Sequence, residues 1–145
     1  MSGEELAILQ NIQTALQAID GSTGYYNDID ADDIHLGWRD IEKAGVYPSI
    51  WVSNYRSPQS IQTEQINFDV NFSVEVLGYI KNNAGEEEVL SDCAKLASDM
   101  GKAIYADESI GSSEVWNLQI GTELYAYNPF GIVLLRISGT YSYNC

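Results

Sequence analysis

The residues most able to do chemistry are four aspartates in one short segment, Asp28, Asp30, Asp32 and Asp33. Carboxylates at alternate positions are typical of a calcium-binding loop, in which positions 1, 3 and 5 supply ligands. Counted from Asp28, position 6 is Asp33 where such a loop needs glycine, and position 12 is Arg39 where it needs glutamate. The segment is therefore interpreted as a solvated acidic loop, with weak binding of a divalent ion as the alternative.

The other candidate catalytic side chains stand alone. His35 is the only histidine, and no Gly-x-Ser-x-Gly or cysteine–histidine signature accompanies it. Cys93 lies in a helical pattern and Cys145 is far from it, and two isolated cysteines make neither a disulfide framework nor a zinc site. The segment 21–24 has no lysine and no glycine fingerprint for phosphate. Among 21 acidic residues no catalytic pair is singled out, so we expect no enzymatic activity, no cofactor and no metal.

Composition restricts the class of partner. The 145 residues suit one domain, 1–145, and 45% hydrophobic content is that of a globular chain. A net charge of −14 with seven scattered basic residues argues against specific nucleic-acid binding and against an anionic membrane surface. No apolar run approaches the ~20 residues that cross a bilayer, and the start MSGEEL lacks a secretory pattern. We expect a protein made in a reducing cytosol.

The clearest structural signal is the alternation between Ile66 and Val76. Apolar side chains occupy every second position and polar side chains the positions between, which predicts a strand with one buried and one solvated face. The pattern continues more weakly to Ile80. At roughly 3.3 Å per residue the run from Ile66 to Ile80 would span about 45–50 Å, whereas a compact chain of this size is roughly 40 Å across. The strand must bend, as at Gly78, or project toward another subunit.

Two amphipathic helices are predicted, over residues 4–19 and 86–105, with Asp20-Gly21 as the stop signal of the first. Their apolar faces are formed by Leu9, Ile12, Leu16 and Ile19 in the first helix and by Leu90, Cys93, Leu96, Ala97, Met100 and Ile104 in the second. Further strands are predicted at 47–52, 116–120 and 132–143, with a loop at 53–62 and a turn at Asn128-Pro129. In the irregular segment 22–47, Tyr25 and Tyr26 could open a short strand. This order predicts an α+β fold: a mostly antiparallel twisted sheet with one very long strand, and two helices packed on one face.

Ten tyrosines and three tryptophans have two explanations. Tyrosine-rich surfaces are typical of protein interfaces, and tyrosine also simply suits strands. Tyr125, Tyr127 and Phe130 cluster around a turn, where strand propensity explains less.

In its order of features the whole chain resembles the phage tail terminator, or tail-completion, proteins. An N-terminal helix from Leu6 to Ile19 comes first, and a short proline-containing strand over residues 47–52 follows. Then come the long alternating strand, the helix from Val89 to Ile104, and a closing strand that reads Ile-Val-Leu-Leu-Arg-Ile-Ser-Gly-Thr-Tyr from Ile132. No sharp motif and no catalytic residue carries the resemblance, and the acidic loop departs from it.

The resemblance implies a structural virion protein that forms a ring, usually a hexamer. Such a ring caps the last ring of the tail tube, ends tail polymerisation, and offers a joining surface to the head or neck. The implied partners are further copies of the chain, the tail tube protein, the head–tail connector or neck protein, and the sheath protein if the tail is contractile. The implied location is the tail or neck of the virion, with assembly in the host cytoplasm.

Assembly into a ring would explain both the long strand and the acidic loop. A long exposed strand edge is covered when a neighbouring subunit adds a strand, so we expect the region 62–81 to reach toward a neighbour. The subunit-contact candidates are Phe68, Val70, Phe72, Val74, Val76, Tyr79, Tyr125, Tyr127 and Phe130. Carboxylates that line the lumen would not bind passing DNA, and the lumen-facing candidates are Asp28, Asp30, Asp32 and Asp33.

Two other classes stay open. One is a head-completion or neck adaptor protein of the same virion, which is also a ring and would differ in its assembly partner. The other is an acidic α+β binding module or hydrolase outside any virion.

Overall fold

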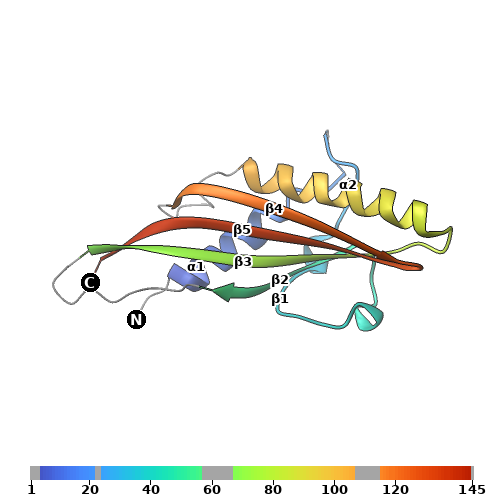
Figure 1. The fold of residues 1–145 in the computed structure, drawn as a ribbon, viewed down its shortest axis with the longest axis horizontal. Helices are drawn as coiled ribbons and strands as arrows, with labels where there is room; N and C mark the ends of the chain where they lie inside the picture. The colour runs from blue at the N-terminus through green and yellow to red at the C-terminus, as the bar shows by residue number, and fades with distance from the viewer. Residues whose placement is uncertain (1–3, 22–23, 57–66, 107–114, 145) are drawn as a thin grey trace.

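The computed structural model describes residues 4–21, 24–56, 67–106 and 115–144, and shows a mixed five-stranded sheet with two α-helices (Figure 1). The elements in chain order are α1 Glu4–Leu16, β1 Ile34–Leu36, β2 Ser49–Arg56, β3 Asn67–Lys81, α2 Glu86–Tyr105, β4 Val115–Tyr127 and β5 Phe130–Asn144, with short 3-10 helices at Ala31–Asp33 and Ile41–Lys43. The strand order is β1-β2-β3-β5-β4. β1 and β2 are parallel, and the other neighbouring strands are antiparallel. Two α-helices beside a mostly antiparallel sheet make the fold α+β, as expected.

The pairing of β3 with β5 is the longest in the sheet. It runs without interruption from Asn67↔Asn144 to Lys81↔Phe130. One very long strand was expected, at β3. The sheet has two strands of that length, since β3 and β5 both have 15 residues, and β4 has 13. The turn at Asn128-Pro129 joins β4 to β5, as predicted.

Both α-helices pack on one face of the sheet and share a single core with it. Alternation in β3 points Val74 and Val76 at the helices, and both side chains are fully buried. The helices supply the opposite side of this core from Ile8, Ile12, Leu16, Val89, Cys93, Leu96, Met100, Ala103 and Ile104. Three glutamates in the first turn of α2 and Lys102 in its last turn complement the helix dipole.

Two glycines allow α2 to approach the sheet closely. A Cβ atom placed on Gly131 would lie 2.5 Å from Cys93 Sγ and 2.8 Å from Val89 Cγ1. A Cβ atom placed on Gly78 would lie 2.7 Å from Leu96 Cδ2. Gly78 is thus a packing position beneath α2, and β3 stays paired with β5 on both sides of it.

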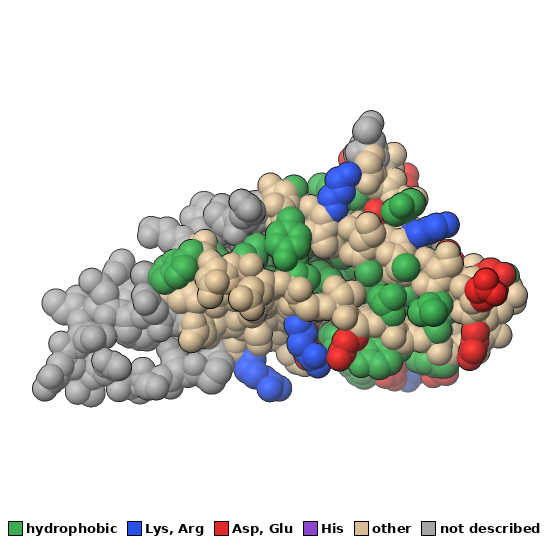
Figure 2. Space-filling model, turned by 45° about the horizontal axis from the view of Figure 1, so that its top comes forward, with side chains coloured by type: hydrophobic (Ala, Val, Ile, Leu, Met, Phe, Trp, Pro, Cys, Tyr) green, Lys and Arg blue, Asp and Glu red, His purple; other side chains and the backbone are tan. Residues whose placement is uncertain are grey.

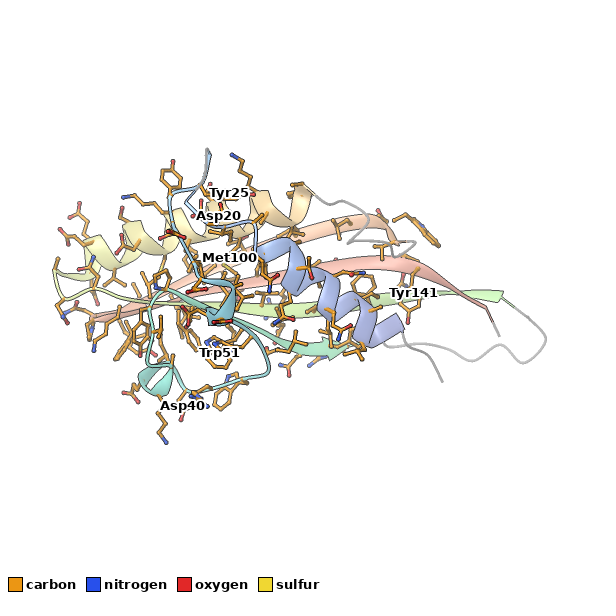
Figure 3. All side chains as sticks on the ribbon, turned by 180° about the vertical axis from the view of Figure 1, so that it is seen from behind. Asp20, Tyr25, Asp40, Trp51, Met100 and Tyr141 are labelled. Carbon is orange, nitrogen blue, oxygen red and sulfur yellow. The ribbon has the colours of Figure 1, made fainter. Side chains whose placement is uncertain are left out.

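A second, smaller core lies on the opposite face of the sheet. Ile41, Trp51 and Tyr79 are buried there, beneath the segment that follows β1. Tyr47 donates a hydrogen bond to the Ile41 carbonyl, and Tyr79 donates one to the Arg39 carbonyl at 2.8 Å. Figure 3 shows Trp51 on the side of the sheet along which the segment with Asp40 runs.

The first helix ends earlier than predicted. It stops at Leu16, and Gly21 takes a left-handed conformation (φ +77°) in the turn that follows rather than at the helix end. Its fully buried positions are Ile8, Ile12 and Leu16, with Leu9 only partly buried.

The second helix has the predicted limits, but its buried stripe is shifted. Leu90 is 47% exposed, and Val89 is buried in its place. Tyr25 and Tyr26 open no strand; the irregular segment instead contributes β1 and an isolated bridge between Asp20 and Asp28.

The strands of the sheet's flanks run further than predicted. β2 continues to Arg56 through a register shift, so the predicted loop begins later, and residues 57–62 lie outside the described residues, as does Ile66. β4 is more than twice its predicted length. Its register also shifts, between Trp116 and Gln119, where Asn117 has a φ of +59°. Trp116 therefore points away from the face on which Leu118 and Ile120 pack.

Replacing Gly131 by Ala should lower the free energy of unfolding by about 1–3 kcal/mol, because the added methyl group overpacks the α2–sheet interface. Urea denaturation measures this change. Gly121→Ala is the matched control, since a Cβ atom there meets nothing within 4 Å and should change stability by less than about 0.5 kcal/mol. Equal stability of both variants would contradict the close approach of α2.

Candidate functional site

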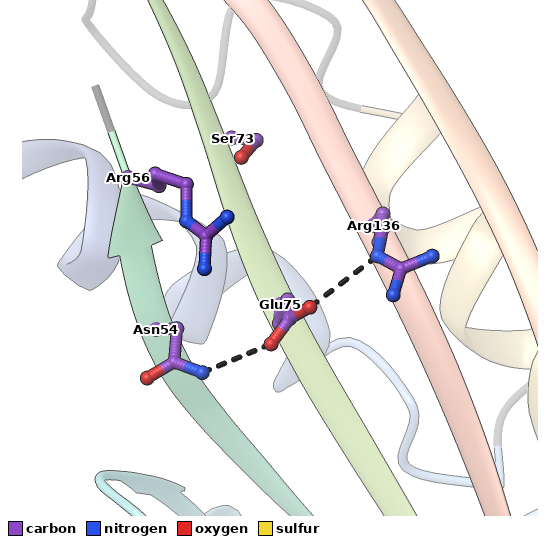
Figure 4. Close-up of a pocket in the computed structure, with 5 residues that line it drawn as sticks. All are labelled: Asn54, Arg56, Ser73, Glu75 and Arg136. Carbon is purple, nitrogen blue, oxygen red and sulfur yellow. Dashed lines mark hydrogen bonds and ion pairs between the residues drawn. The ribbon is translucent and has the colours of Figure 1, made fainter. Parts of the chain in front are cut away.

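The open face of the sheet, opposite the helices, carries a continuous row of polar side chains. Asn54 donates to Glu75 at 2.9 Å, and Arg136 donates to the other Glu75 oxygen at 3.3 Å (Figure 4). Arg136 also contacts Glu123 at 3.5 Å, and the Tyr125 hydroxyl donates to Glu123 at 2.9 Å. This polar row, as we call Asn54, Glu75, Arg136, Glu123 and Tyr125, crosses β2, β3, β5 and β4 in that order.

A shallow pocket of about 380 Å³ opens beside the polar row. Arg56 from β2 and Ser73 from β3 line it together with Asn54, Glu75 and Arg136 (Figure 4). Both carboxylate oxygens of Glu75 accept hydrogen bonds, and the Arg56 guanidinium, whose charge also helps to lower the pKa of Glu75, donates none to a described residue. The pocket therefore presents the hydrogen-bond donors of the Arg56 side chain to solvent.

The charged groups of the polar row interact mainly with one another. The hydrogen bond from Asn54, with the neighbouring Arg136 guanidinium, holds the pKa of Glu75 below its ordinary value despite partial desolvation. The only two salt bridges among the described residues, Arg136–Glu75 and Arg136–Glu123, both belong to this row. Such exposed pairs orient side chains more than they stabilise a fold.

The acidic loop is held in a fixed conformation beside the helices. Ile29 is buried, and its amide donates to the Ile19 carbonyl at 2.8 Å. Gly21 donates to the Asn27 carbonyl at 3.0 Å. The side chains of Asp28, Asp30 and Asp32 are exposed on this frame, and Asp33 is half-buried.

Asp99, which was not among the residues predicted to be functional, anchors the start of this loop. Asp99 is 1% exposed on α2, and its carboxylate accepts from the Tyr26 amide (2.9 Å), the Asn27 amide (2.8 Å) and Asn27 Nδ2 (2.8 Å). Lys102 adds a bond to the Gly24 carbonyl at 2.9 Å. The signal was present, because Asp99 falls on the buried stripe of α2.

A wide acidic hollow of about 470 Å³ is lined by Asp20, Asp28, Asp30 and Asp33. Within the described ranges, no three histidine, cysteine, aspartate or glutamate side chains are arranged to hold a metal ion.

His35 and Cys93 are both used in packing. The His35 ring stacks on Trp51 with centroids 4.1 Å apart, and Arg39 lies over the same indole. Cys93 is buried, as the sequence suggested, and burial raises the pKa of its thiol to about 11. A neutral, buried thiol is a poor nucleophile. Cys145 lies outside the described residues.

The predicted subunit-contact residues fall into three groups. Phe72, Val74, Val76 and Tyr79 are buried in the two cores of the chain itself, so their side chains are not exposed on the surface of the single chain. The side chains of Phe68 and Val70 lie outside the described ones, although their backbone pairs with β5. Tyr125 and Tyr127 are about half exposed and Phe130 is half-buried.

Charge is unevenly spread over the surface. Figure 2 shows basic side chains as small separate patches and acidic side chains gathered at the end of the molecule where α2 begins. No basic stripe is visible on this face, in keeping with the net charge of −14. None of the described helices is both long and apolar enough to span a membrane.

No protein-family model matches the chain, and no curated protein sequence matches it significantly.

Replacing Glu75 by Gln should lower the free energy of unfolding at pH 7 by at most about 1 kcal/mol, since the pair with Arg136 is exposed. The lowered pKa means that this stability is present above the ordinary value of 4.5 and is lost as pH falls through the folded-state value. The difference from wild type should therefore shrink as the pH falls below 4.5 and vanish once Glu75 is protonated in the folded chain. Urea denaturation at several pH values measures it. Glu42→Gln is the control, and a difference independent of pH at Glu75 would be the contrary result.

In a Cys145→Ser background, Cys93 of the folded chain should react with a thiol reagent at pH 8 at least roughly 100-fold more slowly than in urea, because the raised pKa leaves little thiolate. The colour change of an aromatic disulfide reagent follows the rate. Equal rates with and without urea would mean that Cys93 is accessible and reactive.

Proposed function

We propose that this chain is a structural virion protein of the phage tail terminator, or tail-completion, class. Copies of it would form a ring, hexameric by the resemblance, that caps the tail tube, ends its polymerisation and offers a joining surface to the head or neck. The order of elements suggests the class. The observation that carries the proposal of self-assembly is an open sheet edge.

That edge is the outer side of β4. The strand has 13 residues and pairs with β5 on one side, and no other described strand pairs with it. Edge strands are normally protected by shortness, lysine, proline, a β-bulge or a covering element. β4 contains no lysine and no proline, and Glu123 is its only charged residue. Its bulge lies near one end, between Trp116 and Gln119, and the pairing with β5 from Gln119 to Tyr127 is regular. The opposite edge, β1, is only three residues long. The regular part of the β4 edge, which lacks these other protections, suits pairing with another subunit.

The far end of the β3–β5 ribbon supports the same idea. The pairing of β2 with β3 stops at Arg56↔Ser73, and that of β4 with β5 stops at Val115↔Tyr141. Among the described residues, Asn67–Asp69 and the end of β5 therefore continue as a two-stranded ribbon, which Figure 1 shows at the end of the molecule nearest the C-terminus. This ribbon is the part of the region 62–81 that remains a candidate contact with a neighbour.

The chemistry of the described side chains favours a structural role over catalysis. His35 is stacked on Trp51, and Cys93 is buried with a raised pKa. The polar row has hydrogen-bonding groups on an open surface, which suits contact with another protein. The partners proposed are further copies of the chain, the tail tube protein, the connector or neck protein, and a sheath protein if the tail contracts.

Electron microscopy of the expressed protein, alone and with purified tail tubes, tests this function. We expect rings, free in solution or bound at tube ends. Isolated monomers both in solution and with tubes would overturn the proposal. Binding to the head–neck connector without binding to the tube would instead support the neck adaptor.

Replacing Tyr125 and Tyr127 together by Lys should weaken ring formation at least tenfold, because two cations at the rim of β4 protect the edge from strand addition. Sedimentation velocity measures the fraction assembled, and circular dichroism checks the fold. Tyr105→Lys is the matched control, since Tyr105 is equally exposed on α2. Unchanged assembly in the double variant would exclude this edge from the interface.

A further inference from the structure

Arg56 is the arginine whose guanidinium group forms no hydrogen bond or salt bridge with a described residue. Two of the three arginines of the chain, Arg56 and Arg136, line the pocket on the open face of the sheet. Arg136 is held by Glu75 and Glu123, and the third, Arg39, lies over the Trp51 ring. The Arg56 side chain is exposed and interacts with Glu75 only through its charge, so its five donors are available to a carboxylate from outside the chain.

Self-assembly sets the electrostatic problem that such an arginine could solve. Each copy carries a net charge of −14, so copies that approach one another repel. A contact that places one of the few cations against carboxylates of the neighbour reduces this repulsion. Complementary charge of this kind decides which surfaces meet.

The acidic loop is the surface that fits this cation. Asp28, Asp30 and Asp32 are exposed, and no described residue forms a salt bridge with them. Asp99 and the backbone bonds around Ile29 hold the loop in place, so little conformational entropy is lost when a partner binds. The glutamates at the start of α2 already interact with the helix dipole, which makes them weaker candidates.

The two surfaces cannot meet within one chain. The acidic loop follows α1 and is bonded to α2, on the helical side of the sheet. Arg56 and Glu75 lie on the opposite face, because Glu75 alternates with Val74 and Val76, which pack on the helices. Between two copies the surfaces can meet, and since they differ, the contact is head-to-tail, the kind that closes into a ring.

We propose that the pocket at Arg56 and Arg136 is a docking site for the acidic loop of a second copy, with Asp30 and Asp32 as the carboxylates that Arg56 binds. This inference rests on the proposed self-assembly and adds which surfaces meet. It gives the aspartates a use at the subunit contact instead of in the lumen.

Reversing the charge of single residues tests the contact. Sedimentation velocity and electron microscopy measure the assembly of the full-length chain, alone or on tail tubes. Arg56→Glu should weaken assembly at least tenfold. Lys95→Glu, an equal change of charge at an exposed position on α2, is the matched control and should weaken it far less. Circular dichroism confirms that each variant is folded.

Reversing the charge of the acidic loop distinguishes docking at Arg56 from a position in the lumen, because the two predict opposite effects on assembly. Asp30→Lys with Asp32→Lys makes the chain less negative, so general repulsion falls, and aspartates that merely face the lumen would leave assembly unchanged or strengthen it. Docking at Arg56 predicts instead that assembly weakens, and that combination with Arg56→Glu restores it.

Normal rings from Arg56→Glu, or stronger assembly from the aspartate variant, would overturn the docking site and leave the ring intact. Absence of any assembly by the wild-type chain, with and without tubes, would remove the proposed function and the docking site together.

Discussion

The uninterrupted antiparallel pairing of β3 with β5 determines which side chains face the helices and which face the open side. Because the register is continuous over all 15 positions of both strands, one slip would exchange the two faces along the whole ribbon. The same register sets Glu75 opposite Arg136 and places Gly131 beneath α2. Packing of the helices and assembly of the polar row are thus two consequences of one strand pairing.

Local patterns explain what could be predicted from the sequence. The alternation in β3 and the apolar stripe of α2 are patterns within one continuous segment of the chain. Both elements form where they were expected. β1 could not be predicted in this way, because three residues become a strand only through parallel pairing with β2, as in Ile34↔Ile50. The bulge at Asn117, which turns Trp116 outward, likewise depends on the partner strand.

The polar row was beyond sequence reasoning for a related reason. Its members are separate polar residues on four strands, and each is an ordinary solvent-facing position in its own strand. Asn54 lay in a segment that resembled a loop, and only the register shift in β2 brings it within reach of Glu75. The acidic loop was recognised from its composition, but its rigidity comes from Asp99, seventy-two residues from Asn27.

In the proposed assembly the long strand would act differently from the way its length suggested. Its apolar side chains from Phe72 to Tyr79 pack in the two cores of the chain and are not exposed on the surface of the single chain. What the sheet leaves for a partner is backbone at the β4 edge and polar groups on the open face. Such groups are compatible with water before assembly, whereas an exposed apolar strand would aggregate. A subunit that must remain soluble until it meets a tube or another copy therefore gains from hiding its apolar strand and exposing charge. In a chain this acidic, Arg56, whose guanidinium forms no hydrogen bond with a described residue, is then the group best able to discriminate among possible contacts.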